Sequence, residues 1–113
     1  MSDATQTGSE FVFIYTPLPD MGAAEAMARA LVDARLAACV NIYPGIMSVY
    51  EWKGEAETSV EVVAFVKTRR GLVDETLAAM RKLHPYEVPA FLVLPIEGGN
   101  EDYLTWARGQ VKS

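Results

Sequence analysis

The stretch LHPYEVPAF, residues 83–91, contains the only histidine of the chain, His84. Tyr86 and Glu87 follow it closely, so an imidazole, a phenol and a carboxylate stand near one another. Such groups bind metals or carry protons in acid–base catalysis. In an extended chain, however, His84 and Tyr86 share one face while Glu87 points to the other. The stretch is therefore not a ready-made chelate.

Pro85 gives the same stretch a structural interpretation. A residue before proline is pushed out of the helical region, so we expect His84 to end a helix, with its ring donating to the last helical carbonyls. The alternative is an enzyme that uses His84 with Tyr86 or Glu87. That alternative requires His84 to lie in a concave pocket beside a carboxylate of perturbed pKa.

Other metal ligands are scarce. Zinc sites usually draw about three or four ligands from Cys, His and carboxylates, and this chain has one His and one Cys. A site shared between subunits, or a weak surface site that uses Glu55, Glu57 or Glu61, is left open. Cys39 lies in the apolar run LAACV and is predicted to be buried and inert. No CxxC pair or phosphate-binding loop is present.

Hydrophobic periodicity predicts the order β-α-β-β-α-β-α. Residues 11–16 form a strand ended by Pro17 and Pro19, and Asp20 caps a helix that runs to about residue 36. A strand interrupted at Pro44-Gly45 and a second arm, SVEVVAFVKT, form a hairpin around the turn GEAET. A helix ending at Leu83, a strand FLVLPI and a helix capped by Asn100 complete the chain. This is the α+β, ferredoxin-like split βαβ arrangement with an antiparallel sheet.

The hairpin is longer than a domain of this size can cover with its own helices. Tyr50 and Trp52 share one strand face, and large amphipathic rings are typical of subunit interfaces. We therefore expect part of the hairpin to pack on another chain.

Composition limits the remaining possibilities. The 113 residues suffice for one domain, predicted over residues 10–113 after a disordered tail at residues 1–9. The net charge of -5 and the scattered basic residues argue against nucleic acid. A lone cysteine, a polar N-terminus and short apolar runs predict a cytoplasmic protein without a disulfide framework or membrane span.

Several spaced motifs resemble the CutA divalent-ion-tolerance family from about Phe11 to Val111. They are AACVNIYPG, SVYEWKG, the glutamate and KT of EVVAFVKT, HPYEVP and YLTW. The resemblance implies a homotrimer, similar in plan to the PII signalling proteins, whose hairpins pair across subunits. It also implies tolerance of copper and other divalent cations, without specifying a mechanism. Because the sequence offers no catalytic constellation, our leading hypothesis is a protein without catalysis that binds metal weakly or acts as a signalling scaffold.

The resemblance also implies an inter-subunit cleft, which we expect to contain Tyr50, Trp52, Glu61, Lys67, Tyr86 and Glu87. A rival function is a PII-like sensor that binds a small molecule, such as a small anion, in these clefts. Family members linked to copper use a cysteine near the end of the first strand and two adjacent histidines. Here Tyr15 and Leu83 replace two of these ligands, so His84 alone matches, and Ala90 replaces a common glutamate.

Overall fold

The computed structural model describes residues 9–113. Four strands, three α-helices and a short 3₁₀ helix follow one another in the predicted order. The elements are β1 (Phe11–Leu18), α1 (Met21–Asp33), β2 (Cys39–Trp52), β3 (Glu55–Arg69), η1 (Arg70–Leu72), α2 (Val73–Leu83), β4 (Leu92–Ile96) and α3 (Glu101–Gln110).

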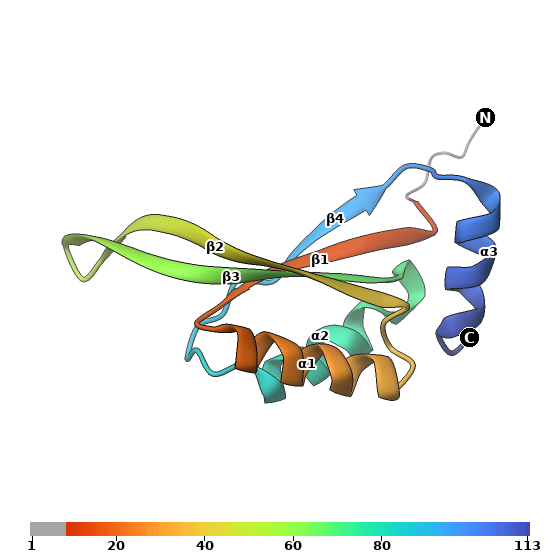
Figure 1. Ribbon diagram of the computed structural model, residues 1–113, viewed down its shortest axis with the longest axis horizontal. Coiled ribbons are helices and arrows are strands. Elements are labelled where there is room, and N and C mark those ends of the chain that lie inside the picture. Colours follow the sequence, from red (N-terminus) through yellow and green to blue (C-terminus); the bar gives the residue numbers. More distant parts are fainter. Residues whose placement is uncertain (1–8) are drawn as a thin grey trace.

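The strands form one antiparallel sheet in the order β2-β3-β1-β4. Helices α1 and α2 cover one face of this sheet, and α3 stands beyond its end (Figure 1). Alternate side chains of β1 and β3 point into the core, which includes Ile14, Leu18, Val62 and Val66. This arrangement confirms the α+β, ferredoxin-like fold.

Strand β1 is longer than predicted, because Pro17 lies within it and pairs with Val63 of β3. The neighbouring strand β4 pairs with β1 only as far as Tyr15. At Pro17, β1 therefore pairs with β3 alone. Proline lacks a backbone N–H, but on the side away from β3 there is no strand whose carbonyl would need that donor.

The hairpin turn is tighter than predicted. Trp52 pairs with Glu55, so the turn consists of Lys53 and Gly54, and the sequence GEAET is largely strand. Lys53 and Gly54 have φ values of 53° and 84°. Two-residue turns with both φ values positive match the twist of the flanking strands.

The interruption at Pro44-Gly45 is confirmed as an irregularity in β2. Tyr43 pairs with Val63 and Ile46 with Glu61, so Pro44 and Gly45 stand opposite a single residue of β3. This extra residue reverses the alternation of β2 side chains. Beyond it, Tyr50 and Trp52 share the face of the sheet opposite the helices.

Two smaller differences lie at the ends of α1 and β2. Asp20 caps α1 as predicted, its side chain accepting from the backbone N–H of Ala23. The helix ends at Asp33, before residue 36, because Arg35 has a left-handed φ of 60°. Cys39 opens β2 and is only partly buried, contrary to expectation.

We call residues 46–60 the hairpin arm. They extend past the helices to one end of the molecule (Figure 1). Several large apolar side chains there are exposed, and Val49 and Val60 are 71% and 70% exposed. The arm therefore has little core of its own.

None of the helices within residues 9–113 is both long and apolar enough to span a membrane.

Candidate ligand groove and metal site

His84 connects the end of α2 to β1. Its backbone N–H caps α2 by donating to the Met80 carbonyl. The sequence suggested that the ring would donate to the last helical carbonyls. Its Nε2 instead lies 2.8 Å from the carbonyl oxygen of Pro17. Nδ1 accepts a 3.1 Å hydrogen bond from the Tyr86 N–H. A carbonyl can only accept, so the proton lies on Nε2 of a neutral imidazole.

Burial lowers the pKa of His84, although the Pro17 carbonyl and the Glu61 carboxylate partly oppose this effect. The neutral ring uses both nitrogens, so a metal could bind His84 only by displacing one of its hydrogen bonds. The short chain from Pro17 through His84 to Tyr86 thus fixes the start of the loop between α2 and β4.

Tyr86 and Glu61 join this loop to the hairpin. The Tyr86 hydroxyl donates to Glu61 Oε2 at 2.5 Å, and the Tyr86 ring packs 4.9 Å from the His84 ring. Burial, together with the Glu61 carboxylate, strongly raises the pKa of Tyr86. The phenol therefore stays a neutral donor at physiological pH. Glu61 is 8% exposed and its position is set by this bond.

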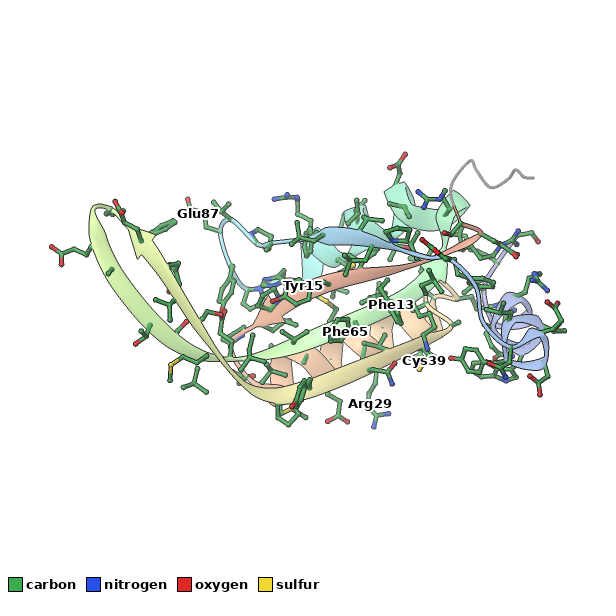
Figure 2. All side chains as sticks on the ribbon, turned by 90° about the horizontal axis from the view of Figure 1, so that it is seen from above. Phe13, Tyr15, Arg29, Cys39, Phe65 and Glu87 are labelled. Atoms are coloured by element: carbon green, nitrogen blue, oxygen red, sulfur yellow. The ribbon has the colours of Figure 1, made fainter. Side chains whose placement is uncertain are left out.

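A groove of about 790 Å³ lies between the arm and this loop. We call it the arm groove. It brings together the residues predicted for the cleft except Lys67. Figure 2 shows Glu87 on the loop that follows α2. The residues that line the groove are Pro17, Ser48, Val49, Tyr50, Trp52, Glu57, Ser59, Glu61, Pro85, Tyr86, Glu87, Val88 and Ala90.

Lys67 lies elsewhere on the sheet. It is on the same strand face as Glu61 but six residues further along β3, a distance of about 20 Å. Its ammonium group donates to the Tyr103 hydroxyl at 2.8 Å and lies 5.4 Å from the centre of the Phe13 ring. Figure 2 shows Phe13 toward the Cys39 end of the sheet, away from Glu87.

The predicted cleft did not include Ser48, Glu57 or Ser59, which line the groove; Glu57 was named only as a possible ligand of a weak surface metal site. In the hairpin register Tyr50 pairs with Glu57 and Ser48 with Ser59. Directly opposed residues of antiparallel strands share a face. A correct turn at Lys53 and Gly54 would have placed these residues beside Tyr50.

The described residues contain no group of three His, Cys, Asp or Glu side chains arranged to hold a metal ion. Tyr15, where the resemblance implies a cysteine in copper-linked members, packs edge-on against Phe65 at 5.7 Å between centroids, and both lie on the central strands (Figure 2). Leu83 is exposed, and Ala90 lines the groove without offering a ligand atom. A divalent ion would need ligands beyond those that residues 9–113 of one chain bring together.

Comparison with known proteins identifies the family. Residues 12–110 match the model of the CutA1 divalent ion tolerance protein family. This chain belongs to that family. It is 42% identical, over 99% of its length, to human Protein CutA. It is 43% identical, over 88% of its length, to the divalent-cation tolerance protein CutA of Thermus thermophilus.

Solved CutA structures have the same fold. The divalent cation tolerance protein of T. thermophilus superposes with a TM-score of 0.86 at 39% identity, covering 90% of this chain and 99% of that one. The protein of Archaeoglobus fulgidus, described as periplasmic, gives 0.87 at 36% identity, covering 90% and 99%. The chain spans 65% of the human protein and 94% of the T. thermophilus protein.

Proposed function

We propose that this member of the divalent-cation tolerance family is a cytoplasmic homotrimer that binds copper or other divalent ions weakly, or acts as a signalling scaffold, without catalysis. The observation that carries this proposal is the hairpin arm. Its apolar side chains lie beyond the reach of α1 and α2, and they are the surface that a second chain would cover.

Assembly supplies what one chain lacks. Exposed apolar patches on the scale of the arm are typical of interaction sites, and association would bury Met47, Val49 and Val60. Neighbouring arms would also bring carboxylates of different chains together. Weak metal binding then follows from Glu57, Glu61 and Glu87, supplemented by His84 where it exchanges a hydrogen bond for the ion.

Native mass spectrometry and a copper titration test this proposal. A trimer is expected, with copper binding that weakens in the His84→Ala variant. Identical millimolar-range binding in both proteins would remove the His84 part of the proposal. A well-folded monomer at micromolar concentration would remove the assembly and the shared site with it.

A second candidate is a small-molecule sensor of PII-like plan. The arm groove favours it, because a volume of about 790 Å³ with aromatic walls and a few polar groups is typical of ligand sites. A small anion, however, would face three carboxylates and no basic lining residue. A rise in melting temperature with one metabolite would support the sensor, whereas none across nucleotides and metabolites would argue against it.

A further inference from the structure

Glu61 is a buried charge without a countercharge in the described part of its own chain. It is 8% exposed, and within residues 9–113 it forms no ion pair with a basic side chain. The Tyr86 hydroxyl donates to its Oε2, which leaves Oε1 for a further donor. The arm groove around it is lined by two more carboxylates, Glu57 and Glu87, and by no Lys, Arg or His of those residues. Burying an unpaired carboxylate costs free energy, so a cation from outside the chain would stabilise Glu61.

Lys67 is the complementary case on the same strand. Its ammonium group donates to the Tyr103 hydroxyl and lies 5.4 Å and 4.7 Å from the centres of the Phe13 and Tyr103 rings. A hollow of about 120 Å³ adjoins it, and among residues 9–113 no carboxylate lines this hollow and none forms an ion pair with Lys67. The rings hold the ammonium group in place and leave it with further N–H donors.

The two groups cannot meet within one chain. Glu61 and Lys67 lie on the same face of the sheet, but they are six residues apart on β3, a distance of about 20 Å. The groove of Glu61 adjoins the arm, whereas Lys67 contacts α3, and the arm and α3 lie at opposite ends of the molecule (Figure 1). Only a second chain can bring a lysine of this kind into the groove.

We propose that Lys67 of the partner subunit enters the arm groove and forms an ion pair with Glu61. The two sites are opposite in charge, and each lacks an ionic partner among the described residues of its own chain. In a head-to-tail ring each chain gives its groove to one neighbour and its lysine to the other, so a single kind of contact is used throughout. An ammonium–carboxylate hydrogen bond is stronger than a neutral one, and this bond would fix how the arm lies on the next chain.

This inference rests on the proposed function, because it requires the trimer, and it names the residue that a partner contributes to the groove. The pair uses Glu61 alone. Glu57 and Glu87 are exposed and stay available to a divalent ion.

Charge reversal tests the pair. Glu61→Lys and Lys67→Glu should each weaken assembly at least about tenfold, because each places like charges opposite one another between subunits. A variant with both changes should recover most of this loss. Tyrosine hydroxyls can donate or accept, so Tyr86 and Tyr103 keep a hydrogen-bond partner after the exchange. Native mass spectrometry across a dilution series measures assembly, and circular dichroism confirms that each variant folds.

Lys82→Glu is the matched control. Lys82 is exposed on α2, on the helix side of the sheet, and the same reversal there should leave assembly unchanged. If a reversal unfolds the chain, Glu61→Gln and Lys67→Gln replace it, and their losses should not add in the double variant. A double reversal that assembles no better than either single one would overturn the pair, as would additive losses in the neutral variants.

Cross-linking gives a second measurement on the unchanged protein. A carbodiimide joins a carboxylate directly to an amine that contacts it. Peptide mass spectrometry should find Glu61 joined to Lys67, a link that only two chains can form. Glu75 and Lys112, whose charged atoms lie 2.6 Å apart within one chain, are the positive control.

The same samples separate this inference from the proposed function. A wild-type trimer in which the double reversal brings no recovery removes the ion pair alone. A wild-type monomer at micromolar concentration removes both the ion pair and the assembly.

Discussion

Strand β3 passes through two environments. Val66 is completely buried against the helices, whereas Val60 on the same strand is 70% exposed. Both side chains point to the same face, because the two residues are an even number of positions apart on the strand. The helices cover this face only at the Val66 end, and the arm extends past them (Figure 1). The same residue type therefore stabilises the fold at one end of β3 and is available for association at the other.

The largest expected effect comes from placing a charge on the arm. Val49→Glu should weaken the proposed trimer by about 100-fold or more, because burying an unpaired carboxylate costs several kcal/mol. Native mass spectrometry across a dilution series measures the change. Val32→Glu on α1 is the control, since Val32 is an exposed valine away from the arm. Wild-type assembly in the Val49 variant would show that the arm is not the interface.

Two equal truncations compare the ends of β3 directly. Val66→Ala should lower the free energy of unfolding by about 2 kcal/mol, because it leaves a cavity in the core. Val60→Ala should cost less than about 0.5 kcal/mol when the chain is kept dissociated by Val49→Glu. Urea unfolding in that common background measures both. Equal costs would mean that the arm valine packs within its own chain.

Glu61 lies where the buried and exposed parts of β3 meet, and Tyr86 holds it there. Tyr86→Phe should lower the free energy of unfolding by about 1–2 kcal/mol, because a buried carboxylate loses its donor. Tyr43→Phe is the matched control, since Tyr43 is exposed and its hydroxyl is expected to contribute little. Thermal unfolding of both variants compares them. Equal, small effects would show that solvent replaces the Tyr86 hydroxyl without cost.

Local patterns were enough to predict most of the fold. Proline and glycine at positions 44 and 45 indicated the irregularity in β2, and periodicity placed the helices. The end of β1 could not be predicted in this way. Whether Pro17 stays in the strand depends on where the distant strand β4 stops pairing, at Tyr15.

The groove, like the fold, was predictable only where local patterns determine which residues lie together. Residues near one another on the hairpin, such as Tyr50 and Glu61, follow from strand geometry. Lys67 lies six residues beyond Glu61 along β3, so it is outside the groove of its own chain, and its place in a cleft between subunits stays a prediction. The bond from His84 to the Pro17 carbonyl joins residues that are far apart in sequence. No local pattern predicts such a contact, and the sequence therefore suggested the wrong acceptor for the ring.

The smallest expected effect is a pH dependence that arises from the loop rather than from the arm. Burial lowers the pKa of His84 below its ordinary value of 6.5, so the unfolded chain binds a proton at a pH where the folded chain does not. The free energy of unfolding should therefore fall as the pH drops below about 6.5, until the folded ring is also protonated. Urea unfolding at pH 7.5 and 5.5 measures this change. His84 is the only histidine, so His84→Gln should flatten the profile, whereas an unchanged slope in that variant would place the titrating group elsewhere.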